Sequence, residues 1–188
     1  CLLGRVTCVR IDFRTSPDFL ARVASLVGAK IVIAAKSLNT DNLTSIDVWP
    51  LEMLLGQVSA VPQKQIADNS DRASRDLAEI IFTSGATSEP KGVEITHGNV
   101  LANIVPVEQE ITKYLKYGRP FLPLRFLNLL PLSHMFGQAM ATFVPPMLNS
   151  ITVFMRGFNP TDIARQIRTQ RVSVLVCVPK ILDVLRKY

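Results

Sequence analysis

Small hydroxyl residues, two glycines and a lysine follow an apolar run near the middle of the chain. The run, residues 77–82, predicts a strand, and residues 83–92 (TSGATSEPKG) predict the loop after it. Polyphosphates bind to such loops because small residues let backbone N–H groups approach the oxygens, while hydroxyls and a lysine add donors and positive charge. Residues 83–92 therefore indicate a binding site for phosphate groups.

The order of residues excludes the common phosphate loop that closes on Gly-Lys-Ser/Thr. Here Lys91 precedes Gly92, and Gly85 has no Gly-Lys-Ser/Thr partner. On these residues alone, a polar surface turn after a strand stays open as the alternative.

The longer run 80–99 resembles the phosphate-loop signature TSGTTGxPKG of the adenylate-forming superfamily, which includes acyl-CoA synthetases, luciferases and amino-acid adenylation domains. Ala86 replaces a usual hydroxyl residue, which predicts weaker ATP binding or a slower reaction, and Ser88 replaces the usual glycine. The resemblance implies that this loop holds the β- and γ-phosphates of ATP. The predicted phosphate-binding residues are Thr83, Ser84, Gly85, Thr87, Ser88 and Lys91.

A second segment, residues 130–137 (LPLSHMFG), resembles the PLxHxxG segment of fatty-acid-activating members of that superfamily. The resemblance implies that His134 lies beside the carboxylate being activated, and that Phe136 and Gly137 belong to the region of the acyl channel. Taken alone, His134 would be read as a core or loop histidine. His97 is expected to help position the start of a helix. Residues 9–17 and 172–179 also resemble the family, so the resemblance covers nearly the whole chain.

The pocket segment carries no acid, since no Asp or Glu lies between Glu110 and Asp162. An amino-acid substrate would bring a buried ammonium that needs a carboxylate. The segment offers instead large apolar side chains, which favour a fatty-acid-like substrate, with simple core packing as the alternative for some of them: Leu132, Met135, Phe136, Met140 and Phe143.

The resemblance implies a ligase that uses ATP, Mg²⁺ and coenzyme A, first forming acyl-AMP and then transferring the acyl group to the thiol. The family's Mg-binding Glu, ribose-binding Asp and catalytic Lys belong to motifs that this chain lacks. We therefore expect no metal ligand and no catalytic residue here, and we expect the chain alone to be inactive. Two alternatives stay open: a fatty acyl-AMP ligase that loads a carrier protein, and a non-catalytic nucleotide-binding module.

Predicted strands alternate with predicted helices along the chain, and several strands are apolar throughout. This pattern favours an α/β fold with parallel or mostly parallel sheets covered by helices, here part of the N-terminal domain of an adenylate-forming enzyme. Helices are expected to start at Pro17, Pro160 and Pro179, and Pro106 is expected to kink or split a helix. We expect residues 1–75 to form part of a first α/β subdomain with a linker. Residues 76–188 then form part of a second one that carries the phosphate loop.

Composition limits the remaining classes. Hydrophobic residues make up 48% of the 188 residues, which excludes a mainly disordered chain. The net charge of +6 is scattered, with aromatics at 7%, so no nucleic-acid site is expected. Polar residues and prolines interrupt the apolar residues 127–148, so no transmembrane segment is expected. The spacing of the three cysteines favours reduced thiols in a cytoplasmic protein. Both ends look cut, and apolar surface exposed by truncation makes a dimer plausible.

Overall fold

The computed structural model describes residues 6–58, 74–83, 89–118, 122–155 and 157–187. The chain packs as two compact units. The first contains residues 1–72 and 78–94, and the second contains residues 73–77 and 95–188. The predicted boundary between residues 75 and 76 stays a prediction about the subdomains of a larger fold.

The first unit contains a three-stranded sheet in the order β1-β4-β5. Strand β1 (Cys8–Arg10) pairs in parallel with β4 (Leu77–Thr83), and Cys8 lies opposite Glu79. Strand β5 (Lys91–Thr96) lies on the other side of β4. The predicted loop over residues 83–92 is therefore too long at its end, because Lys91 and Gly92 already belong to a strand.

Helix α1 (Pro17–Leu26) begins where the sequence predicts it. The Ser16 hydroxyl accepts a hydrogen bond from the backbone N–H of Phe19 at 3.3 Å, which satisfies a donor at the helix start. The chain leaves the helix through Gly28, whose positive φ of 58° suits a residue without a Cβ atom.

A separate two-stranded sheet lies in the same unit, with β2 (Ile31–Ala34) parallel to β3 (Asp47–Pro50) and followed by α2 (Leu51–Val58). Side chains alternate between the two faces of a sheet. Ala34 is buried on one face, whereas Ile33 and Trp49 lie opposite each other on the other face and are exposed.

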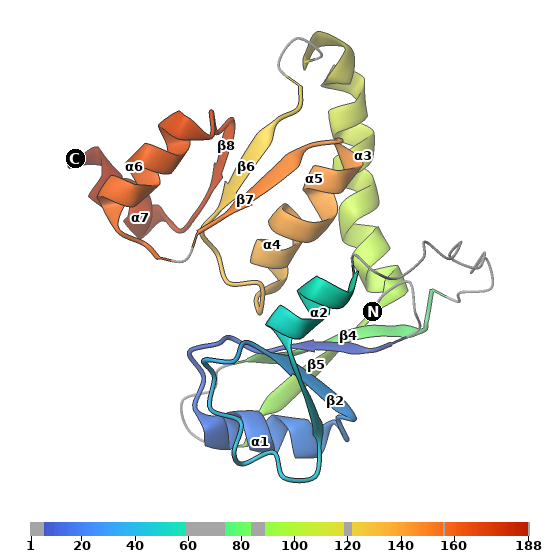
Figure 1. Cartoon of the computed structure of the whole chain (residues 1–188). Coiled ribbons are helices and arrows are strands. Elements are labelled where there is room, and N and C mark those ends of the chain that lie inside the picture. The colour runs from blue at the N-terminus through green and yellow to red at the C-terminus, as the bar shows by residue number, and fades with distance from the viewer. Residues whose placement is uncertain (1–5, 59–73, 84–88, 119–121, 156, 188) are drawn as a thin grey trace. The chain divides into compact units, whose positions relative to one another are not determined.

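The second unit is built on a parallel sheet in the order β7-β6-β8 (Figure 1). Its strands are β6 (Arg125–Asn128), β7 (Ile151–Phe154) and β8 (Val174–Val176). Neighbouring residues of the central strand enter different core clusters: Phe126 packs with Val144 and Leu148, and Leu127 packs with Leu129 and Ile163. Burial on both faces explains why both Phe126 and Leu127, neighbours in this strand, are apolar.

Helices cover this sheet, and the starts predicted at Pro160 and Pro179 are confirmed. Asn159 caps α6 (Pro160–Thr169), its side-chain oxygen accepting from the N–H of Thr161 at 3.0 Å. The remaining helical segments are α3 (His97–Gly118), α4 (Met135–Gln138), the π-helical segment η3 (Ala139–Phe143), α5 (Val144–Met147) and α7 (Pro179–Arg186). The expected α/β fold with mostly parallel sheets covered by helices is confirmed.

Pro106 lies inside the single 22-residue helix α3, so the predicted split does not occur. A proline removes one backbone donor and crowds one carbonyl, and hydrogen bonds on both sides keep a long helix continuous. Across the described ranges, no helix is both long and apolar enough to cross a membrane. Cys8 and Cys177 are free thiols and only partly buried, and burial raises the pKa of the Cys177 thiol.

Candidate functional site

The two strands that flank the predicted phosphate loop are neighbours in the first unit's sheet. Strand β4 ends at Thr83, and β5 begins at Lys91. Of the other predicted phosphate-binding residues, Ser84, Gly85, Thr87 and Ser88 lie outside the described residues, and only the backbone of Thr83 is described.

Gly92 shows how closely the flanking strands approach each other. A Cβ atom at Gly92 would lie 2.8 Å from Cγ2 of Ile80 and 3.0 Å from Cζ of Phe82. A side chain there would collide with two residues of β4, which gives a packing reason for the glycine that follows Lys91. The packing of Gly92 against β4 therefore fixes the two strands from which residues 84–90 extend.

The Lys91 side chain is exposed at the start of β5. No carboxylate in the described part of the chain forms an ion pair with it. An ammonium with these surroundings is available to an anion, as the role in phosphate binding requires.

A buried ion pair holds the strand that leads into the loop. Arg10 of β1 lies 3.6 Å from a carboxylate oxygen of Glu79 in β4, and the Glu79 side chain is 1% exposed. Neither residue was predicted from the sequence. The only sequence signal would have been a charged residue at the third position of an otherwise apolar strand.

The junction between β5 and α3 is closed by local hydrogen bonds. The Asn99 side chain accepts from the backbone N–H and the hydroxyl of Thr96, and the Thr96 hydroxyl accepts from the Asn99 N–H. The backbone N–H of His97 donates to the carbonyl of Asp76 at 2.9 Å. These bonds agree with the expected role of His97 at a helix start.

The second predicted segment forms a tight loop between β6 and α4 in the second unit. The backbone N–H of His134 donates to the carbonyl of Pro131 at 3.2 Å, and the carbonyl of His134 accepts from the N–H of Gln138 at 3.0 Å. His134 sits at the N-cap position of α4, and its exposed imidazole makes no capping bond. The imidazole is thus presented to the surface by a backbone that is fixed on both sides.

Phe136 and Gly137 lie in the same loop and the first turn of α4, with opposite environments. The Phe136 side chain is 62% exposed, and Gly137 is buried against the backbone carbonyl of Pro131 and the Leu130 side chain. Phe136 can therefore offer apolar surface beside His134, whereas Gly137 allows the loop to close. Met140 packs against the cluster around Phe126, so core packing explains that residue.

The predicted site residues fall in both units. Lys91 belongs to the first unit, whereas His134, Phe136 and Gly137 belong to the second. The structure also adds Asn128, which is buried at the end of β6 and hydrogen-bonds to the loop that carries His134. A polar residue inside an apolar strand was the available signal for it.

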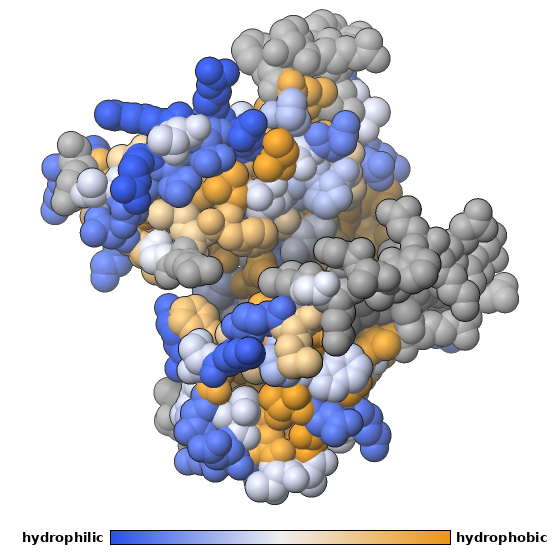
Figure 2. Space-filling view, in the orientation of Figure 1, coloured by the Kyte–Doolittle hydropathy of each residue, from blue (hydrophilic) through white to orange (hydrophobic). Residues whose placement is uncertain are grey.

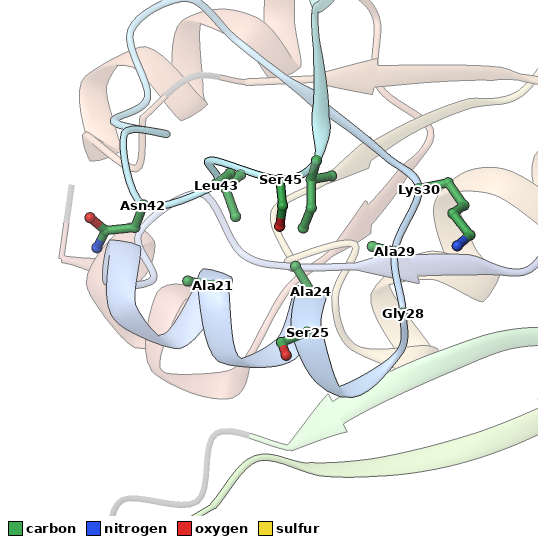
Figure 3. A pocket seen from close by; sticks show the side chains of 10 residues that line it. Ala21, Ala24, Ser25, Gly28, Ala29, Lys30, Asn42, Leu43 and Ser45 are labelled. Atoms are coloured by element: carbon green, nitrogen blue, oxygen red, sulfur yellow. The ribbon is translucent and has the colours of Figure 1, made fainter.

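Two hollows in the described residues lie away from these side chains. A cavity of about 260 Å³ lies in the first unit, lined by small side chains of α1 and by the loop over residues 42–46 (Figure 3). A groove of about 190 Å³ lies between α6 and α7, lined mainly by Phe158, Ile163 and Leu185. Within the described ranges, no three His, Cys, Asp or Glu residues come together as metal ligands do.

Comparison with known proteins connects this arrangement to a family. The model of the family described as "AMP-binding enzyme" matches residues 1–188. The chain is 26% identical over 174 residues to 4-coumarate--CoA ligase-like 6 of Arabidopsis thaliana, covering 92% of this chain and 29% of that protein. It is 28% identical over 141 residues to long chain acyl-CoA synthetase 8 of the same plant, covering 71% and 19%.

Among solved structures, the chain resembles o-succinylbenzoate CoA synthetase (MenE) from Bacillus subtilis in complex with the acyl-adenylate intermediate OSB-AMP. The TM-score is 0.74 at 21% identity, over 100% of this chain and 46% of that one. Other structures of the same enzyme hold AMP, ATP with a magnesium ion, or a CoA product analogue. The chain thus spans less than half the length of the proteins it matches here.

Proposed function

The chain belongs to the AMP-binding enzyme family, and we propose that it is part of an ATP-dependent ligase that activates a carboxylic acid as acyl-AMP. The match of the family model to residues 1–188 carries this proposal. An exposed Lys91 within the phosphate-loop signature supports it from the structure.

Each predicted loop residue would contribute to holding a phosphate chain. The ammonium of Lys91 and the hydroxyls of Thr83, Ser84, Thr87 and Ser88 would bind the β- and γ-phosphates, with Gly85 in the same loop. Fixed cations and donors supply most of the catalysis in phosphoryl chemistry, since negative charge shifts among the phosphate oxygens during the reaction. Mg²⁺ would share the negative charge of the phosphate oxygens of ATP.

The test is the Lys91→Ala substitution in the complete ligase that contains this chain. We expect single-turnover formation of acyl-AMP to slow by about 100-fold or more, as for the loss of one preorganised donor, with little change in binding of the acid. Lys30→Ala is the matched control, because Lys30 is also an exposed lysine of the first unit. Unchanged acyl-AMP formation by the Lys91→Ala variant would rule out the assigned role.

The proposed acid is fatty-acid-like. The support is the absence of Asp and Glu between Glu110 and Asp162, together with the exposed ring of Phe136 beside His134. One relative is named long chain acyl-CoA synthetase 8, whereas the name of another refers to 4-coumarate, a different kind of acid. A panel of acids in the ATP–pyrophosphate exchange assay decides this point, and preference for an amino acid would contradict it.

Coenzyme A is the proposed acceptor of the acyl group, because several relatives are named as CoA ligases or CoA synthetases. Transfer of the acyl group to a carrier protein instead of coenzyme A would identify the enzyme as a fatty acyl-AMP ligase. The 188-residue chain alone is proposed to be inactive in the exchange assay, and a cytoplasmic location is part of the same proposal.

A further inference from the structure

Asn128 ends the central strand β6 with its side chain almost fully buried, at 4% exposure. Its amide nitrogen donates to the carbonyl of Leu130 at 3.0 Å and to the carbonyl of Gly137 at 3.4 Å. Its side-chain oxygen accepts from the N–H of Leu130 at 3.3 Å. One amide therefore joins the start of the loop that carries His134 to the end of that loop.

Burying an amide costs free energy unless its polar groups are hydrogen-bonded, whereas an apolar side chain of similar size would pack there without that cost. The neighbours of Asn128 in the strand, Phe126 and Leu127, enter the two apolar clusters of the core. The bonds made by Asn128 point instead to the loop backbone. The amide thus closes a ring of chain from residue 128 to residue 137.

The backbone of His134 lies within this ring of chain. The backbone of His134 bonds to Pro131 on one side and to Gln138 on the other, and both of these residues lie next to the positions that Asn128 holds. The exposed imidazole makes no capping bond of its own. The backbone therefore fixes the point from which the imidazole extends.

We propose that Asn128 is a positioning residue that fixes His134 for contact with the carboxylate of the substrate. This inference rests on the proposed function, in which His134 lies beside the acid being activated. Asn128 itself touches no substrate in this scheme. It acts through the loop backbone alone.

Asn128→Asp in the complete ligase tests the loss of the amide N–H without a change in side-chain size, because aspartate has the same shape. It still accepts from the N–H of Leu130. It has no N–H for the carbonyls of Leu130 and Gly137, so the loop loses its closure. A misplacement of about 1 Å costs on the order of 100-fold in rate. We expect kcat/KM for the acid to fall by roughly that factor, with binding of a fluorescent ATP analogue unchanged.

A double-mutant cycle with His134→Ala tests whether the effect passes through His134. We expect the double variant to lose no more activity than His134→Ala alone. Losses that multiply would overturn the inference, because Asn128 would then act elsewhere. If His134→Ala has no effect while Lys91→Ala still does, the role of His134 is wrong and the inference fails with it, but the proposed ligase function stands.

Two further variants control for folding. Thr152→Val removes another side-chain bond of this unit, from the Thr152 hydroxyl to the carbonyl of Ala141 at 2.9 Å, and should leave kcat/KM for the acid nearly unchanged. Asn128→Ser removes the amide without introducing a charge and should reproduce the loss seen with aspartate. If neither Asn128 variant binds the ATP analogue, Asn128 is simply a residue of the core and the inference is wrong.

Discussion

At Gly137, a single methyl group would have two opposing effects. Alanine favours a helix over glycine by about 1 kcal/mol, and Gly137 lies in α4. The new Cβ atom would, however, collide with the backbone carbonyl of Pro131 and come within 2.8 Å of the Leu130 Cβ atom. Neither group can rotate away. Because overpacking of this kind costs about 1–3 kcal/mol, the collision should outweigh the gain in helix propensity.

We therefore expect Gly137→Ala to lower the free energy of unfolding of the purified chain by about 1–2 kcal/mol. Urea unfolding followed by far-UV circular dichroism measures this change. Gly157→Ala is the control, because a Cβ atom at Gly157 meets nothing within 4 Å. If Gly137→Ala is as stable as the parent chain, the loop between β6 and α4 adjusts more easily than the packing indicates.

Residue types predicted which residues share this loop better than they predicted the hydrogen bonds that hold the loop. The sequence placed His134, Phe136 and Gly137 in one segment, and the structure shows why the glycine is needed there. It did not identify Asn128, because the partners of that side chain are backbone groups that any residue provides. Beyond the polar residue type of Asn128 itself, hydrogen bonds to the backbone leave no pattern of partner residue types in a single sequence.

At the scale of elements, one ion pair links the strand before the phosphate loop to its neighbour. Arg10 in β1 and Glu79 in β4 lie on parallel strands, and the carboxylate is removed from water. Removing one partner of a buried pair takes away a charge that stabilises the other, which costs more than the pair contributes. Replacing both residues by apolar ones removes that cost.

We expect Arg10→Met to destabilise the chain by about 2–3 kcal/mol, less than for a fully buried pair because part of Arg10 is in water. The double variant Arg10→Met/Glu79→Leu should be more stable than Arg10→Met alone. Urea unfolding of both single variants and the double variant gives the coupling free energy. Additive losses would show that the two charges do not stabilise each other in β1 and β4.

The elements themselves were largely predictable, since caps, prolines and apolar runs act locally. Ser16, Asn159 and Pro179 each mark a helix start that the structure contains. Of the two effects predicted for Pro106, the split does not occur, because the rest of α3 keeps the helix continuous through it. The strand beginning at Lys91 was missed because Lys91, Gly92 and Glu94 do not resemble an apolar strand, and pairing with β4 decides their conformation.

At the scale of the whole chain, the exposed face of the β2–β3 sheet presents apolar side chains that could be buried by association. Ile33 and Trp49 face each other across the strands and are 54% and 44% exposed. Figure 2 shows apolar atoms at the surface of this unit among hydrophilic ones. Apolar surface of this kind favours association when nothing else covers it. The expected dimer of the isolated chain, which stays a proposal, would use this face.

Trp49 reports on that association directly, because it is the only tryptophan of the chain. Raising the concentration of the isolated chain should increase its mass in sedimentation velocity and shift the Trp49 emission to shorter wavelength. Ile33→Lys should weaken the association by at least about tenfold, since burying an isoleucine is worth roughly 1.5–3 kcal/mol. Leu182→Lys is the control, as Leu182 is equally exposed, at 52%, but lies on α7 of the second unit. A mass that stays monomeric at every concentration would disprove the dimer, and an increase in mass with unchanged Trp49 emission would place the contact on another surface.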